Sequence, residues 1–96
     1  MNATRSARDD GRAAGLDLAL FDASDLRAEL DALTPSRYDD ADVILSRYVD
    51  GLDDLAARAA DRRGIPEADR AAWCAAYVSG ATERYRETLR AWEEAA

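Results

Sequence analysis

Residues 55–77 read LAARAADRRGIPEADRAAWCAAY, and this stretch predicts two helices joined by a tight turn. Gly64 stands where helices commonly end in a left-handed residue, and the arginines before it suit the negative end of a helix dipole. Pro66 fits the first turn of the next helix, because its missing N–H would have no helical partner there. Since only Gly64 and Ile65 link the two segments, the stretch predicts an antiparallel helical hairpin.

The helix before the turn is expected to begin at Asp39 or Asp40, or at Pro35 if Thr34 caps it, and to end at Arg63. Apolar side chains recur at helical spacing on one face, and aspartates occupy the opposite face. Gly51 interrupts the pattern at a cost of about 1 kcal/mol relative to alanine, so it marks a kink or a close helix contact. The apolar face consists of Ala41, Ile44, Leu45, Tyr48, Leu52, Leu55, Ala56 and Ala59.

The helix after the turn is expected to run from Pro66 to about Glu94. One side carries large apolar residues, which suit packing across two neighbouring helices. A second stripe of small residues permits close approach of another backbone. The first set is Trp73, Tyr77, Val78, Ala81, Tyr85, Leu89 and Trp92, and the second is Ala72, Ala76 and Gly80.

A shorter helix is expected from Asp22 or Ser24 to Leu33, because leucines recur there on one side and Pro35 stops it. Before it, the segment LDLALF at 16–21 alternates between apolar and other residues. That alternation fits an extended arm packed on the helices, a strand that pairs with another chain, or the lead into a helix.

Residues 1–15 are polar, lack apolar periodicity and contain Gly11 and Gly15, which predicts a flexible N-terminal tail. The sequence as a whole therefore predicts an all-α protein. Its expected architecture is a small antiparallel helical bundle, made of a long helical hairpin plus a shorter helix. The expected organisation is a tail over 1–15 and a single helical domain over 16–96.

The charge of the chain is concentrated in one segment. The 96 residues include 20 acidic residues and 13 arginines, with no lysine or histidine, for a net charge of −7. The whole excess lies within residues 22–54, and it fits either docking on a basic partner protein or a solvated face. The acidic residues proposed to contact a partner are Asp39, Asp42, Asp50, Asp53 and Asp54.

Four aromatic residues of the helix after the turn, Trp73, Tyr77, Tyr85 and Trp92, are candidates for a partner-binding or dimer surface. The alternative is that they form the core of the bundle. Trp92 lies close to the C-terminal end, where a three-helix monomer offers little cover, so it is the strongest candidate for an intermolecular contact.

Several kinds of chemistry are disfavoured by composition. Without histidine or lysine, and with Cys74 as the one thiol, the chain lacks the usual general base, a Schiff-base amine and the ligands of a structural zinc site. The aspartate clusters do not match a calcium-binding loop. We therefore expect no enzyme activity, no cofactor and no metal. Nucleic-acid binding would require a basic stripe, and no signal peptide or membrane-spanning run is present, so a cytoplasmic location is expected.

These observations predict a regulatory or inhibitory protein that binds another protein through an acidic and aromatic helical surface. An antiactivator, an antitoxin or an immunity protein would have this character. The alternative is a homo-oligomeric structural or adaptor protein, such as a phage assembly component, in which the helix over residues 66–94 packs on a second copy. An enzyme that uses carboxylates and a divalent metal ranks behind both.

Overall fold

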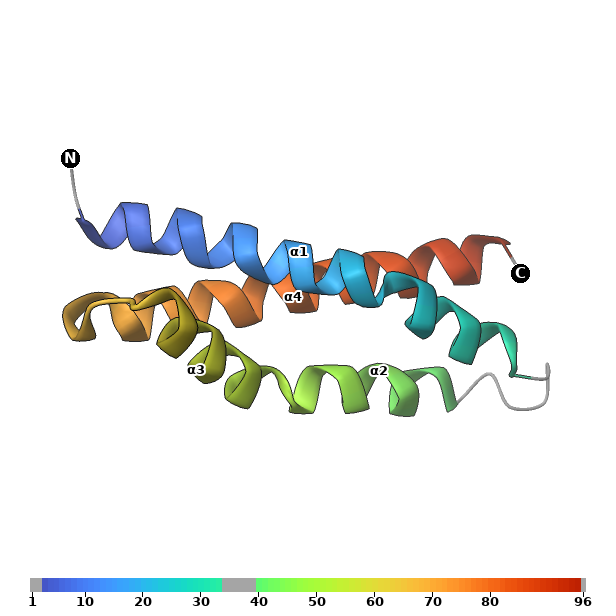
Figure 1. Ribbon diagram of the computed structural model, residues 1–96. Helices are drawn as coiled ribbons and strands as arrows, with labels where there is room; N and C mark the ends of the chain where they lie inside the picture. The colour runs from blue at the N-terminus through green and yellow to red at the C-terminus, as the bar shows by residue number, and fades with distance from the viewer. Residues whose placement is uncertain (1–2, 34–39, 96) are drawn as a thin grey trace.

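A computed structural model describes residues 3–33 and 40–95, which form an elongated all-α molecule of 49 × 22 × 18 Å (Figure 1). The predicted all-α class is confirmed. The predicted stop at Pro35 and the candidate partner residue Asp39 lie outside the described residues. The helices are α1 (Ala3–Asp31), α2 (Asp40–Asp50), α3 (Leu52–Arg63) and α4 (Glu67–Ala95).

The hairpin predicted around Gly64 is formed by α3 and α4. Gly64 has φ 65°, and its N–H donates to the carbonyl of Asp61 over 3.2 Å. The N–H of Ile65 donates to the carbonyl of Ala60 over 3.1 Å. These two bonds satisfy carbonyls that the end of α3 would otherwise leave unpaired, and they reverse the chain within two residues. Both boundaries lie within one residue of their predicted positions.

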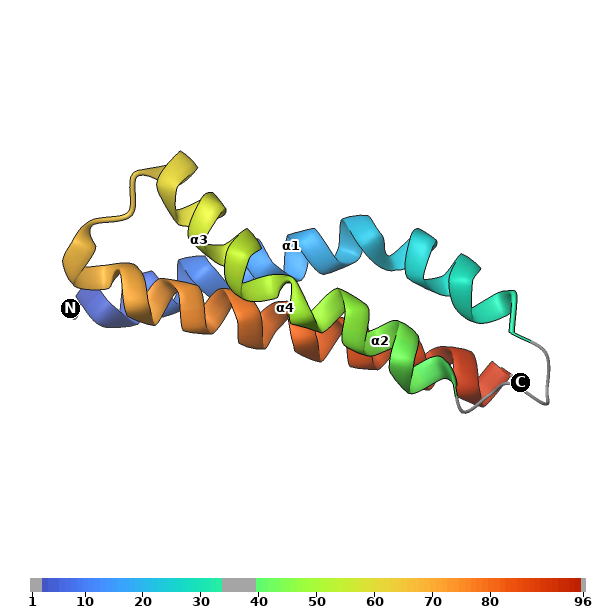
Figure 2. The ribbon, with the colours of Figure 1, turned by 90° about the horizontal axis from the view of Figure 1, so that it is seen from below.

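Gly51 separates α2 from α3, so the interruption expected there is a kink and not a close helix contact. Its backbone stays near helical values at φ −85° and ψ −4°, and no neighbouring atom lies within 4 Å of where a Cβ would stand. Seen from the side of α2 and α3, the two segments follow a bent path across the pair formed by α1 and α4 (Figure 2). The bend lets α2 contact both α1 and α4, while α3 packs mainly on α4.

The predicted flexible tail is wrong over residues 3–15, and the segment 16–21 is neither a strand nor an arm, because α1 begins at Ala3 and is continuous to Asp31. Gly11 and Gly15 pack against the backbone of α4. A Cβ on Gly11 would overlap the carbonyl oxygen of Trp73, and one on Gly15 would overlap that of Tyr77. The glycines thus permit close contact, and this contact offsets their low helix propensity.

The contact between α1 and α4 is the most extensive between any two of the described helices. On α4, Gly80 permits the same close approach to α1, since a Cβ there would lie 2.7 Å from the carbonyl oxygen of Arg12. Three glycines thus direct a Cα–H at a carbonyl of the facing helix, a weak but recurring polar contact. The small residues of α1 recur every four positions, at Ala7, Gly11, Gly15 and Ala19.

The two helices in this contact run in the same direction (Figure 1). Trp73 reaches Asp10 and Tyr85 reaches Asp22, a constant separation of 63 residues that fixes the register. The bundle is therefore antiparallel along the chain, from α1 to α2 and from α3 to α4, but its first and last helices are parallel.

The large side chains of α4 fill the space between this pair and the covering helices. Trp73 and Tyr85 are fully buried, as are Leu26 and Leu30 of α1 and Leu52 of α3. Small residues therefore face the other long helix, and aromatic residues fill the remaining core. The other buried core residues include Ala41, Ile44, Ala56, Ala59, Ala60, Tyr77, Ala81, Leu89 and Trp92.

Replacing Gly15 with alanine tests the close contact. Alanine is the better helix former by about 1 kcal/mol, but its methyl group would strike a backbone carbonyl that cannot move aside. We expect Gly15→Ala to lower the free energy of unfolding by about 2 kcal/mol, within the range for overpacked cores, as measured by urea denaturation followed by circular dichroism.

The matched control is Gly51→Ala, which adds the same methyl group where nothing lies within 4 Å. Because the backbone of Gly51 is already near helical values, this variant should be more stable than the wild type by about 0.5–1 kcal/mol. Equal effects of the two substitutions would contradict the glycine contact.

Candidate protein-binding surface

The described acidic candidates all face solvent. Asp42 and Asp50 of α2, and Asp53 and Asp54 of α3, are exposed, while the buried side chains of those helices point to the opposite side. This arrangement follows from the sequence, because aspartates and apolar residues alternate at helical spacing. The four carboxylates are thus available to a partner.

The acidic segments of α1 and α2 lie in the same half of the molecule (Figure 1). Residues 17–31 contain five acidic residues and one arginine, and residues 40–50 contain three acidic residues and one arginine. Since α2 runs back along the second half of α1, both negative segments share one half of the long molecule (Figure 1). The fold therefore concentrates a charge that the sequence distributes over two helices.

Two carboxylates of α1 hold the neighbouring helices. The Tyr48 hydroxyl of α2 donates to Glu29 Oε2 over 2.5 Å, and the Tyr85 hydroxyl of α4 donates to Asp22 Oδ2 over 2.7 Å. The two tyrosine rings pack with centroids 5.3 Å apart. Burial, and then the bond to the carboxylate, raise the pKa of each phenol above its ordinary value. Asp22 and Glu29 therefore serve the fold.

The aromatic candidates Trp73, Tyr77, Tyr85 and Trp92 are core residues, so they offer no exposed surface on the single chain. Trp92, proposed as an intermolecular contact, is only 5% exposed. The register between α1 and α4 explains its cover, because α1 extends far enough to run beside the C-terminal half of α4. With a separation of 63 residues, the part of α1 beside Trp92 is the turn around residue 29. That turn lies within the predicted helix, but its parallel pairing with α4 was not predicted.

The indole of Trp73 has a polar partner from the region predicted to be a tail. Its Nε1–H donates to Asp10 Oδ2 over 2.6 Å, and the Arg63 guanidinium lies 5.8 Å from the ring centroid. Asp10 also forms an ion pair with Arg63, whose Nη1 lies 3.6 Å from Asp10 Oδ1. The buried indole is thus hydrogen-bonded, as a core tryptophan requires.

A groove of about 580 Å³ lies between α2 and α4, next to the acidic surface. Its apolar lining is Leu45 and Leu89. Arg86 and Arg90 stand one turn apart on α4, and neither has an ion pair with another residue of the described ranges. Asp42, Ser46 and Glu93 complete the lining. Its mixed charges suit a polar contact with a protein better than capture of one anion.

Sequence reasoning missed the exposed apolar residues of α1. Phe21 is 82% exposed and Leu20 is 61% exposed, and Val43 of α2 is 56% exposed. The available signal was helical spacing. Once residues 16–21 are placed in a helix, the buried stripe through Ala19 and Leu26 leaves Leu20 and Phe21 outside it.

Two other kinds of site are absent from residues 3–33 and 40–95. No group of three or more cysteine or acidic side chains in these ranges is arranged to hold a metal ion. Nor do the same ranges contain a helix with the length and apolar character needed to span a bilayer.

The pKa of Tyr85 predicts a dependence of stability on alkaline pH. Because the phenol holds its proton more tightly in the fold, it contributes stability in full below its unfolded pKa of about 10, and this contribution is lost as the pH rises further. Tyr85→Phe should be less stable near neutral pH by about 1–2 kcal/mol and should lose stability less steeply above about pH 10. Urea titrations at a series of alkaline pH values measure both effects, and an unchanged slope would contradict the assignment.

No family model, curated protein or solved structure matches the chain. The surface features that could contact another molecule are the exposed carboxylates of α1, α2 and α3, together with the exposed apolar side chains of Leu20, Phe21 and Val43.

Proposed function

We propose that this protein is non-catalytic and regulates or inhibits another protein by occupying a basic surface on it. The observation that carries the proposal is the gathering of negative charge on one half of the molecule. The second half of α1 and the whole of α2 lie side by side, with net charges of −4 and −2. Such a surface steers a positively charged partner and selects against acidic ones.

The carboxylates available to the partner are not used elsewhere in the fold. Asp42, Asp50, Asp53 and Asp54 are exposed, and none forms a side-chain ion pair with another residue of the described ranges. Asp22 and Glu29, in contrast, accept hydrogen bonds from tyrosines. The free carboxylates on α2 and α3 are therefore the better candidates for contact.

A basic surface that binds nucleic acid is the most natural target, because such a surface already presents several lysines or arginines together. Covering it would block the nucleic acid by competition. An antiactivator, antitoxin or immunity protein acts in this general way, and the acidic charge supports that class without choosing among its members.

The test compares two variants of equal charge. One replaces Asp42, Asp50 and Asp53 with asparagine, and the control replaces three exposed or half-exposed acids at the opposite end of the molecule (Figure 1), as Asp9→Asn, Glu67→Gln and Asp69→Asn. Each tagged protein is incubated with a lysate of the source organism, and retained proteins are identified by mass spectrometry. We expect one basic protein to be retained by the wild type and the control but lost from the first variant.

Added salt should weaken the complex, because exposed charges more than about 10 Å apart are screened at moderate ionic strength. The partner should then be purified and its affinity for all three proteins measured. Equal affinities for the two charge-matched variants would refute the role of this surface, as would the absence of any stoichiometric partner.

A further inference from the structure

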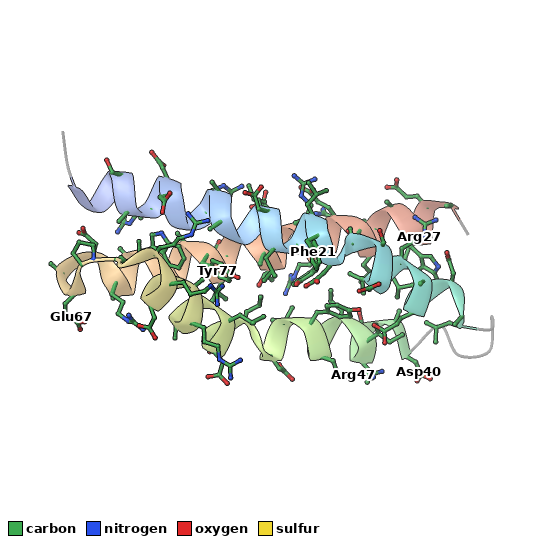
Figure 3. All side chains as sticks on the ribbon, in the orientation of Figure 1. Phe21, Arg27, Asp40, Arg47, Glu67 and Tyr77 are labelled. Carbon is green, nitrogen blue, oxygen red and sulfur yellow. The ribbon has the colours of Figure 1, made fainter. Side chains whose placement is uncertain are left out.

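Phe21 is the most exposed large apolar side chain in the described residues, and Leu20 beside it is also exposed. Phe21 lies in the second half of α1, where Figure 3 labels its side chain. Single exposed apolar residues are normal on protein surfaces. A phenylalanine exposed over 82% of its surface next to an exposed leucine is less usual, and aromatic side chains are frequent anchors of protein interfaces.

Carboxylates flank Phe21 on its own helix. Asp17 lies one turn before it and Asp25 one turn after it, and both side chains are exposed. Neither has an ion pair or a hydrogen bond with another residue of the described ranges. Along α1, a carboxylate is thus followed by an apolar side chain and then by a second carboxylate. The two carboxylates are eight residues apart, which is about 12 Å along the helix axis.

We infer that Leu20, Phe21, Asp17 and Asp25, here called the Phe21 patch, form the docking site for a basic amphipathic helix of the partner protein. This inference rests on the proposed function and specifies the chemistry of the partner. Phe21 inserts between apolar side chains of that helix, and lysines or arginines two turns apart meet the two carboxylates. The partner helix therefore carries an apolar stripe with a basic residue near each end.

Charge selects this occupant over two others. A second copy of the chain docked through the same patch about a two-fold axis would bring Asp17 and Asp25 near their counterparts, and like charges oppose that contact. An anionic membrane surface would repel the same carboxylates. A basic helix satisfies both the apolar and the charged part of the patch.

Two synthetic peptide helices of equal charge test the inference. Both carry lysines two turns apart, one with leucines on the stripe between them and the other with glutamines there. Their affinities are measured by fluorescence anisotropy at low salt. We expect the leucine peptide to bind the wild type at least about tenfold more tightly than the glutamine peptide, a difference of about 1.4 kcal/mol.

The variant Phe21→Ser should remove that preference while the affinity for the glutamine peptide is unchanged. Val43→Ser is the matched control, because it removes another exposed apolar side chain, on α2, and should leave both affinities as they are. The double variant Asp17→Asn, Asp25→Asn should weaken both peptides and reduce the dependence on salt. Circular dichroism verifies that the helices of each variant are intact.

The outcomes separate the patch from the broader proposal. Equal binding of both peptides, unaffected by Phe21→Ser, would overturn the Phe21 patch but leave the acidic surface as a binder of basic proteins. Binding of neither peptide at low salt would count against both. If sedimentation shows a wild-type dimer that Phe21→Ser dissociates, the occupant is a second copy and the inference is wrong.

Discussion

The fold depends on the close contact between the backbones of α1 and α4. Gly11 and Gly15 leave room for the carbonyls of Trp73 and Tyr77, and Gly80 leaves room for that of Arg12. Because the two long helices meet through small residues, the large side chains of α4 are free to point toward α2 and α3. The aromatic core is thus a consequence of the glycine contact.

Polar groups at the ends of the aromatic side chains fix the register that the glycines permit. The Trp73 indole bonds to Asp10 and the Tyr85 phenol to Asp22, at the same separation along the chain. A glycine contact alone is tolerant of sliding, since its small residues repeat every four positions. A shift by one turn would leave a buried donor without a partner, which costs more than the bond itself contributes.

The α3–α4 hairpin could be predicted from the sequence because its signals are local. Gly64 and Pro66 specify a chain reversal whatever surrounds them, and Gly51 weakens a helix by its own propensity. The first half of α1 could not be predicted in the same way. Gly11 and Gly15 reduce helix propensity locally, and their benefit exists only once α4 lies against them. The four-residue spacing of Ala7, Gly11, Gly15 and Ala19 was the signal for this contact.

The same distinction applies to the candidate surface. Asp42, Asp50, Asp53 and Asp54 could be predicted as exposed, because their position opposite an apolar stripe is a property of one helix. Trp92 was proposed as an intermolecular contact, and it is buried because α1 extends beside the C-terminal half of α4. Phe21 was missed for a related reason. Whether a side chain is exposed on a helix can be predicted only after its segment is assigned to a helix, and residues 16–21 were not.

The acidic residues divide into those that the fold uses and those that it does not. Asp10, Asp22 and Glu29 accept hydrogen bonds from aromatic side chains, and that role explains their presence without a partner. Asp17, Asp25, Asp42 and Asp50 make no comparable bond in the described residues, and all four are exposed. A positively charged partner would give these carboxylates the opposite charges that the described part of the fold does not supply. The arrangement thus supports binding more strongly than net charge alone, because two of the unused carboxylates, Asp17 and Asp25, flank Phe21, the most exposed aromatic residue described.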